Sequence, residues 1–489
     1  MHIRNSKKKI SRMGQLVVLF LVSGLISGCT LTRDYQRPRV DIPQTWHVEY
    51  HAAENLANTA WWVQFKDPEL NSLIQTALNE NQDVRIAAAR VEEFTGRLQA
   101  AQSGFYPQLN YWGSTTRDQQ SLERPVPFLA RSTGRTNSTF QTLLNVSWEL
   151  DLWGRIRRSS EAARADLLSA EEGRQAVILT LVSAVASTYF EILKLDKQLQ
   201  ISKQTLASRK EWLHLFENKF KGGQISNEEL AQIKSAYEQS AAYIPNLEWM
   251  IAIHENSLSV LLGRGPGIIK RGKTLDALTL PVIPQGIPSD LLERRPDIRQ
   301  KEQNLIAANA RIGVARTLYF PSISLTGLFG YSSSSLSDLL GSSANLWQLS
   351  GETLGPIFSG GRITGEVRQA EAKEKQLLND YLKTIQTAFR EIDDSIITIQ
   401  KLQELKNIQE RQVVALKEYV HFSRDRYETG FSRYLEVLDA ERNLYAAEIA
   451  YAQTQNDLFS ALVGTYKAMG GGWVAEASQL IQLPGHTTE

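Results

Sequence analysis

One segment of the chain carries the residue pattern of a nucleotide-binding loop. Residues 267–274 fit G-x-x-x-x-G-K-T, in which backbone N–H groups surround a phosphate and the lysine, here Lys273, contacts its outer oxygens. A working loop of this type follows a buried strand and opens a helix. This segment instead follows a helix that ends at Gly263 and leads into a proline-rich stretch at 281–288. We therefore expect a linker here and not an ATP-driven enzyme.

Residues that could hold a metal ion are few and scattered. The chain has one Cys, four Met and seven His, without an H-E-x-x-H pattern. These counts exclude a disulfide framework, a multi-Cys metal site, zincin chemistry and a methionine-lined path for soft metal ions. His47 and His51 are four residues apart and could share a metal only on a helix, but Pro38 and Pro43 favour an extended segment. We expect neither a metal site nor a cofactor.

Cys29 is the one residue for which we expect covalent chemistry. It follows a basic start and an 11-residue, nearly all apolar stretch, Leu16 to Ile26, which is shorter than the roughly 20 residues of a membrane-spanning helix and typical of a signal peptide. Ile-Ser-Gly-Cys at 26–29 resembles the bacterial lipobox. We predict a lipoprotein signal peptide over 1–28 and an acylated Cys29 as anchor; an ordinary signal peptide with a chance cysteine is the alternative.

The charge balance of the chain is close to neutral. Lys and Arg number 54 against 53 Asp and Glu, a net charge of +1. Loss of residues 1–28 removes five cations and no acid, which leaves 49 cations against 53 acids and a net charge of −4. A polybasic surface for nucleic acid is therefore not expected.

The body of the chain is one unit present twice. Asp83-Val84-Arg85 recurs as Asp297-Ile298-Arg299, and Gly154-Arg155-Ile156 recurs as Gly361-Arg362-Ile363. A repeat of about 200 residues is far longer than a solenoid period and indicates duplication of half a protein. The predicted organisation is a lipidated, extended N-terminal segment (29–60), a first repeat (61–263), a linker (264–288), a second repeat (289–470) and a tail (471–489).

Each repeat contains two segments in which polar and apolar residues alternate. The predicted strands are at about 108–116 and 140–153 in the first repeat and at about 321–331 and 346–358 in the second. Their alternation and their length of about ten residues are those of transmembrane barrel strands. A soluble hairpin packed on helices gives the same alternation, so the pattern alone does not separate the two.

A long helical pattern follows each pair of strands. Residues 155–221 and 362–428 contain no proline, and each run is followed by a return helix, at 226–262 and 433–469. Apolar residues at spacings of 4-3-4-3 indicate a coiled-coil seam in the second long helix (Ile385, Phe389, Ile392, Ile396 and Ile399). At 1.5 Å per residue each long helix reaches on the order of 100 Å, about three times a bilayer core.

Four strands are too few to make a closed membrane barrel by themselves. The smallest known membrane barrels have about 8 strands, and an open sheet in lipid would leave unpaired backbone at its edges. The chain must therefore oligomerise if its strands cross a bilayer. Two copies and three copies both satisfy closure, although about 12 strands leave more room for a pore than about 8.

Several motifs, in the same order along the chain, resemble the TolC-like outer membrane factors. In particular, they resemble the NodT and OprM-like lipoproteins of tripartite efflux pumps. The motifs lie at 61–70, 291–298, 320–327, 354–362, 426–430 and 434–442. The resemblance implies a mainly α-helical homotrimer with a 12-stranded β-barrel in the outer membrane and a 12-helix periplasmic tunnel.

The same resemblance implies a function and partners. The chain would be the passive exit duct for an inner-membrane pump, most closely an RND pump, reached through a periplasmic adaptor and surrounded by outer membrane lipids. Thr30, which follows Cys29, is not the Asp that retains lipoproteins at the inner membrane. An ABC exporter or a major-facilitator pump as partner, type I protein secretion, and a non-conducting structural coiled-coil lipoprotein are the alternatives.

The resemblance also implies a gate at the turn between the helices of the second repeat. Glu436 and Asp439 match acids that ring the narrowest point of the tunnel, and Leu435 matches an apolar neighbour that narrows it. The two acids are three residues apart and share a helix face, so three copies would bring six carboxylates together and attract cations. A solvated helix start, with acids that favour the helix dipole, is the alternative.

A closed-state contact is implied beside this gate. Tyr427 matches a tyrosine that holds the closed end through an acid in the first-repeat turn. Glu229 occupies the position of that acid, with Glu228 beside it. We therefore expect a hydrogen bond from Tyr427 to Glu229.

Overall fold

The computed structural model describes residues 34–39, 60–119, 136–281 and 291–470. They form two compact units of interleaved segments. Unit 1 comprises Met1–Pro38, Glu92–Ser169 and Glu302–Asp380, and unit 2 comprises Arg39–Val91, Ala170–Lys301 and Tyr381–Glu489. Each unit takes parts of both predicted repeats. The predicted signal peptide, Cys29, most of segment 29–60, part of the linker and the tail 471–489 lie outside the described residues.

The two halves of the chain contain the same elements in the same order. The first half has α3, β1, β2, α4 and α5, and the second has α7, β3, β4, α8 and α9. The helices are α3 (Gln82–Gln102), α4 (Arg155–Lys221), α5 (Asn227–Leu261), α7 (Pro296–Thr317), α8 (Arg362–Glu428) and α9 (Tyr434–Ala468). Both long helices have 67 residues and both return helices have 35. The long helices have the bounds that their proline-free runs predict.

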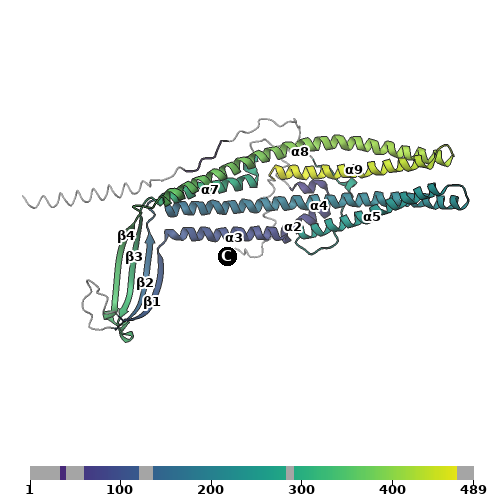
Figure 1. Ribbon diagram of the computed structural model, residues 1–489. Coiled ribbons are helices and arrows are strands. Elements are labelled where there is room, and N and C mark those ends of the chain that lie inside the picture. The colour runs from purple at the N-terminus through teal and green to yellow at the C-terminus, as the bar shows by residue number, and fades with distance from the viewer. Residues whose placement is uncertain (1–33, 40–59, 120–135, 282–290, 471–489) are drawn as a thin grey trace, which may run out of the picture. The chain divides into compact units, whose positions relative to one another are not determined.

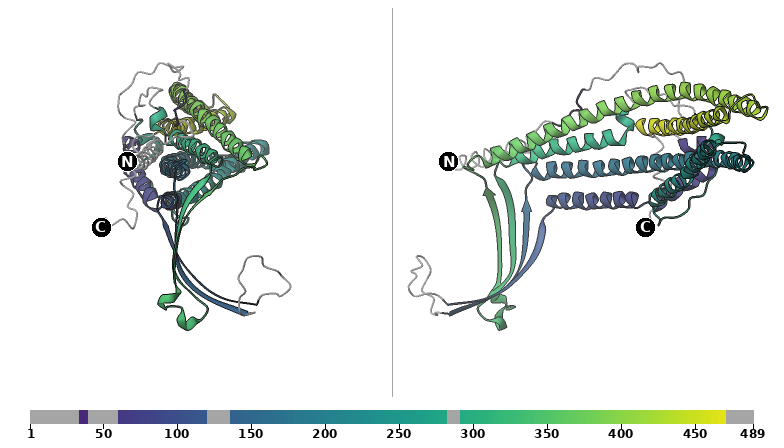
Figure 2. Two further views of the ribbon diagram at one scale, coloured as in Figure 1. Left: turned by 90° about the vertical axis from the view of Figure 1, so that its left-hand side faces the viewer. Right: turned by 45° about the vertical axis from the view of Figure 1, so that its right-hand side comes forward.

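Unit 1 contains a four-stranded antiparallel sheet in the order β1-β2-β3-β4 (Figure 1). Its strands are β1 (Gln108–Gln119), β2 (Thr136–Glu149), β3 (Ser322–Ser333) and β4 (Asn345–Leu354). The two halves of the chain meet in this sheet, where Leu144 of β2 lies opposite Phe329 of β3. The strands bend together in both views of Figure 2. Strand β4 ends before the predicted residue 358, and Pro356 just beyond it has no N–H for a ladder bond.

The sheet is incomplete within one chain. Among the described strands, β1 and β4 each have one neighbour, so each offers an unpaired edge. Large apolar side chains are also uncovered: Tyr111 is 90% exposed, and Trp347 is 72% exposed. The free edges of β1 and β4 can pair with strands of further copies. The exposed aromatic side chains are suited to contact with lipid.

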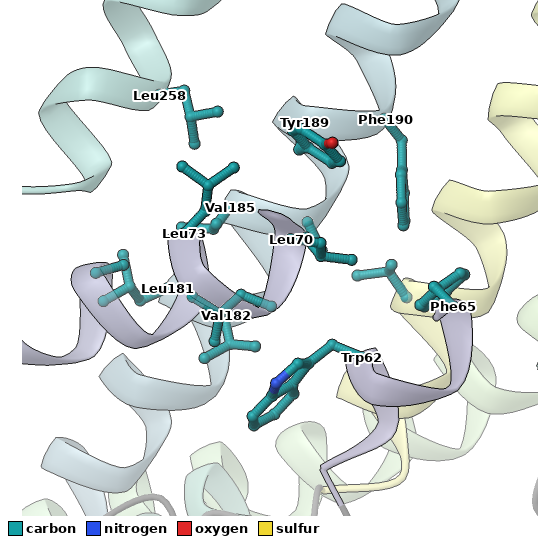
Figure 3. Packing of buried hydrophobic residues seen from close by; sticks show 14 of the residues in the cluster. Trp62, Phe65, Leu70, Leu73, Leu181, Val182, Val185, Tyr189, Phe190 and Leu258 are labelled. Carbon is teal, nitrogen blue, oxygen red and sulfur yellow. The ribbon is translucent and has the colours of Figure 1, made fainter. Parts of the chain in front are cut away.

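Unit 2 has a dense aromatic and aliphatic core. The short helix η2 (Trp61–Phe65) and helix α2 (Pro68–Glu80) pack against residues 178–193 of α4 and against α5 and α9 (Figure 3). Trp61 stacks on Tyr466 of α9 with ring centres 5.1 Å apart. Helix α4 is the one described helix long and apolar enough to cross a membrane, but 61% of its apolar window is buried inside the chain. That burial is typical of a core helix.

The apolar seam predicted on α8 is buried. All five of its residues lie inside the fold: Ile385, Phe389, Ile392, Ile396 and Ile399. Ile399 packs with Leu458 and Leu462 of α9. The seam is thus an inward face of α8, and its last residue packs against the return helix.

The segment that fits a nucleotide-binding loop holds a carboxylate of its own chain. Residues 264–281 contain no α-helix or strand, only a short 3-10 turn at Leu275–Ala277. Lys273 N donates to Asp67 Oδ2 at 3.1 Å, and a side chain at Gly272 would collide with Asp67 Oδ1. The backbone groups that would face a phosphate are therefore used for a structural contact, as expected for a linker.

Candidate functional site

Two similar turns connect the helix pairs of unit 2. Residues 222–226 join α4 to α5, and residues 429–433 join α8 to α9; both turns lie at the same end of unit 2 (Figure 1). Gly223 has φ +70° and Gly430 has φ +81°. These left-handed residues let a backbone N–H just beyond each helix bond back to its last turn, which stops the helix.

The first turn begins α5 with a capping box. Ser226 Oγ accepts from Glu229 N at 3.1 Å, and Ser226 N donates to Glu229 Oε2 at 3.0 Å. Glu228 and Glu229 are both exposed in the first turn of this helix. The carboxylate of Glu229 therefore accepts a hydrogen bond at the start of its own helix.

The second turn presents the predicted gate residues. Leu435 is 56% exposed, and Glu436 is exposed in the first turn of α9. Asp439 accepts hydrogen bonds from Arg442 Nη2 at 2.6 Å and from Asn443 Nδ2 at 3.1 Å. One of the two predicted gate acids thus has a cationic partner on its own helix, in a surface pair of modest strength.

An aromatic cluster joins the two helix pairs beside these turns. We call Trp212, Phe216, Tyr427 and Tyr434 the turn cluster. Ring centres are 4.7 Å apart for Phe216 and Tyr434 and 5.4 Å apart for Trp212 and Tyr427. Ile233 of α5 and Val437 of α9 complete the buried core around these rings. The turn cluster therefore draws on α4, α8 and α9, and α5 packs against it.

Tyr434 is a buried ring of the turn cluster. Burial raises the pKa of its hydroxyl above the ordinary value, and the negative charge of Glu441 adds to the rise. The phenol is therefore neutral throughout the physiological range. It contributes packing, not charge, to this end of unit 2.

Tyr427 lies beside the turns as predicted, but its partner differs from the expected one. Lys219 Nζ donates to the Tyr427 hydroxyl at 2.9 Å. No hydrogen bond joins Tyr427 to Glu229 within the described part of this chain, and the capping box accounts for the Glu229 carboxylate. Within this chain the hydroxyl of Tyr427 is therefore bound by Lys219, and the closed-state contact with Glu229 stays a prediction.

A second polar contact, missed by the sequence reasoning, lies further along the same helices. Arg424 Nη2 of α8 donates to Glu441 of α9 at 2.5 Å and to Ser208 of α4 at 2.7 Å. Ser208 also donates to Glu441 at 3.1 Å. Glu441 is buried and the Arg424 side chain is 38% exposed, so this contact joins three helices at a site that water reaches only from the arginine side. Its sequence signal is faint, because the three residues come from distant segments.

The part of the chain that the structure describes has no candidate metal site. No group of three or more His, Cys, Asp or Glu side chains there is arranged to hold a metal ion. The acids at the second turn are therefore considered as charges facing solvent and not as a ligand set.

Comparison with known proteins gives one consistent result. The family model described as "Outer membrane efflux protein" matches residues 73–264 and 287–471, more than half of the chain. The cation efflux system protein CusC of Escherichia coli is 35% identical over 93% of this chain and 98% of its own length. The probable efflux pump outer membrane protein TtgC of Pseudomonas putida is 32% identical over 96% of this chain and 97% of its own.

A solved structure agrees with these sequence relatives. The open state of the MtrE outer membrane channel of Neisseria gonorrhoeae superimposes with a TM-score of 0.82 and 29% sequence identity. The match covers 91% of this chain and 99% of that channel. The sheet of unit 1 and the paired helices of unit 2 therefore occur in a protein that has been solved as an open channel.

Proposed function

The chain belongs to the outer membrane efflux protein family and is the outer membrane exit duct of a tripartite efflux system, and on that premise we propose how it is gated and which pump it serves. Three copies supply 12 strands for a closed barrel and form a 12-helix periplasmic tunnel, as the resemblance to the TolC-like family implies. The protein is a channel and not an enzyme. Its substrates pass through it without chemistry.

We place the gate at the second turn. Leu435, Glu436 and Asp439 supply an apolar and two acidic side chains at the start of α9, where both turns end unit 2. In a trimer the three copies of this turn would face one axis and narrow the duct to three leucines and six carboxylates. The observation that supports this gate is the exposure of Leu435 and Glu436 at the start of α9.

Divalent-cation block of the purified trimer in planar bilayers tests the gate. We expect Mg²⁺ added on the side of the turns to reduce conductance, and Glu436→Ala with Asp439→Ala to abolish that block, because clustered carboxylates attract cations. The matched control is Glu410→Ala with Glu418→Ala, which removes two exposed acids from α8. Block that persists in the first double variant, or vanishes equally in the control, would place the constriction elsewhere.

We propose an RND-type pump as the inner-membrane partner, reached through a periplasmic adaptor. The lipobox at 26–29 and the match to the efflux relatives support this choice. A photo-crosslinker at the exposed Phe431 of the second turn should capture the adaptor in cells, and an RND pump should co-purify. Co-purification of an ABC exporter would instead identify a type I secretion duct.

A further inference from the structure

The two halves of the chain meet in a close contact at the helix end of the sheet in unit 1. Just after β2, Leu150 N donates to Ile323 O of β3 at 2.9 Å. Trp153 Nε1 donates to Pro321 O at 2.6 Å, and the Trp153 ring stacks on Phe320 with ring centres 4.9 Å apart. We call this contact the inner joint. It connects the segment that leads from β2 into α4 with the segment that leads from α7 into β3.

The repeat places the counterparts of these two segments at the two free edges of the sheet. Residues 150–154, before α4, correspond to residues 357–361, before α8. Residues 320–323 correspond to residues 106–109, where β1 begins. Because every strand pair is antiparallel, the end of β4 and the start of β1 lie at the same end of the sheet. A second copy whose β1 pairs with β4 therefore brings the two counterparts together.

The counterparts are uncovered in one chain, unlike the residues of the inner joint. Leu150 and Phe320 are half-buried, whereas their counterparts Ile357 and Tyr106 are exposed, the tyrosine to 69%. Phe358, next to Ile357, is 90% exposed. Within the described residues, Ile357 N has no backbone acceptor, although the matching Leu150 N has one. A neighbouring copy would thus cover the same groups that the inner joint covers inside the chain.

The segment 355–361 has a defined backbone path at both of its ends. Gly355 passes so close to Pro321 that an added Cβ would lie 2.8 Å from the Pro321 Cβ. Gly360 and Gly361 are left-handed, with φ +57° and +87°, and lead directly into α8. The exposed apolar residues between these glycines are therefore already positioned, and less entropy is lost when a partner covers them.

We propose that the joint between copies repeats the inner joint. Ile357 N donates to the carbonyl oxygen of Leu109 of the next copy, and the ring of Tyr106 of that copy covers Ile357 and Phe358. The occupant of this surface is thus a second copy of this chain in one register, with Ile357 opposite Leu109. Three such joints fix the strand register of the whole barrel. The inference concerns assembly and does not depend on which residues form the gate.

Cysteine cross-linking of trimers in the outer membrane tests the register. Ile357→Cys with Leu109→Cys should give covalent trimers with a short bismaleimide reagent, because opposite residues of an antiparallel pair have Cβ atoms about 5 Å apart. The matched control, Ile357→Cys with Thr115→Cys, moves the second thiol along the same face of β1 by about 20 Å. The control and each single variant should run as monomers on denaturing gels. Covalent trimers in the control, or none in the first pair while native gels show trimers, would overturn the proposed register.

Removal of the apolar side chains tests what the joint contributes to assembly. Ile357→Ser with Phe358→Ser should raise the concentration at which half of the trimer in detergent dissociates by about tenfold or more, because burial of one large apolar side chain contributes that factor. Leu336→Ser with Leu340→Ser removes two exposed apolar side chains between β3 and β4 and should leave that concentration unchanged. Equal dissociation of the two double variants would show that no neighbouring copy covers Ile357 and Phe358.

Discussion

Asp67 is a buried carboxylate that satisfies donors from three segments of unit 2. It accepts from Glu69 N at 2.9 Å, from the Tyr189 hydroxyl at 2.9 Å and from Lys273 N at 3.1 Å. Tyr189 in turn accepts from Gly272 N at 2.9 Å, and burial raises the pKa of its hydroxyl. The entrance to α2, the middle of α4 and the linker are thereby fixed to one another.

Removal of this carboxylate should destabilise the protein strongly. Asp67→Ala leaves the buried Tyr189 hydroxyl and the Lys273 N–H without their acceptor, at a cost of about 3 kcal/mol in the free energy of unfolding. Thermal unfolding followed by circular dichroism measures the change. The control, Glu92→Ala, removes an exposed acid of α3 and should cost far less. Equal stability of the two variants would contradict the structural role of Asp67.

Asp297 should contribute an acid-sensitive part of the stability. Burial acts to raise its pKa, but the hydrogen bond and charge of Arg295, 2.7 Å away, outweigh burial and hold the pKa below the ordinary 3.8. A carboxylate with a lowered pKa in the folded state stabilises at pH values above 3.8, and this stabilisation is lost as the pH falls through the folded pKa. Asp297→Asn should therefore lose less stability than the wild type on acidification below that value. Parallel acid-unfolding curves would refute this.

Residue positions near the turns were partly predictable from sequence. Tyr427 lies near the end of a long helix, and its hydrogen-bond partner in this structure is Lys219; the closed-state contact with Glu229 stays a prediction. Ser226 and Glu229 also form an S-x-x-E capping box, a local sequence signal for the start of α5. Lys219 had no such signal, because its contact depends on packing between residues 208 positions apart.

At the scale of elements, the helices were more predictable than the strands. Each long helix is a run of 67 residues without proline and ends at a glycine turn, and α8 also has a repeated 4-3-4-3 spacing of apolar residues. Such patterns extend over many residues and are therefore easy to recognise. Strand ends depend on pairing partners: β1 continues to Gln119 because Thr136 lies opposite it. The pairing of β2 with β3 across the two halves also has no local sequence signal.

Glycines that end helices should differ in their tolerance of alanine. Gly263 has φ +72°, and an added Cβ would lie 2.1 Å from the backbone oxygen of Glu80. Gly223 has φ +70° with nothing within 4 Å. Gly223→Ala should thus cost about 1 kcal/mol from backbone strain alone, and Gly263→Ala about 3 kcal/mol because of the added clash. Thermal unfolding compares them, and equal losses would show that the backbone shifts freely at Gly263.

At the scale of the whole molecule, the described strands need further copies to close, and the predicted lipid at Cys29 is a second attachment to the membrane. Cys29→Ala should abolish incorporation of radioactive palmitate, since the chain has no other cysteine. The variant should still fractionate with the outer membrane as a trimer, because its barrel strands are unchanged. A wild-type protein that takes up no palmitate would disprove the anchor.

The equal lengths of α4 and α8 limit the insertions and deletions that this protein can accept during evolution. Both turns meet in the turn cluster, and each is carried by a helix of 67 residues. A deletion of two helical turns from α4 alone would draw its end back by about 11 Å and strip Lys219 and Phe216 from their partners. A matching loss from α8 would bring them together again. Inherited insertions and deletions in these rods should therefore survive only in compensating pairs, one in each half of the gene.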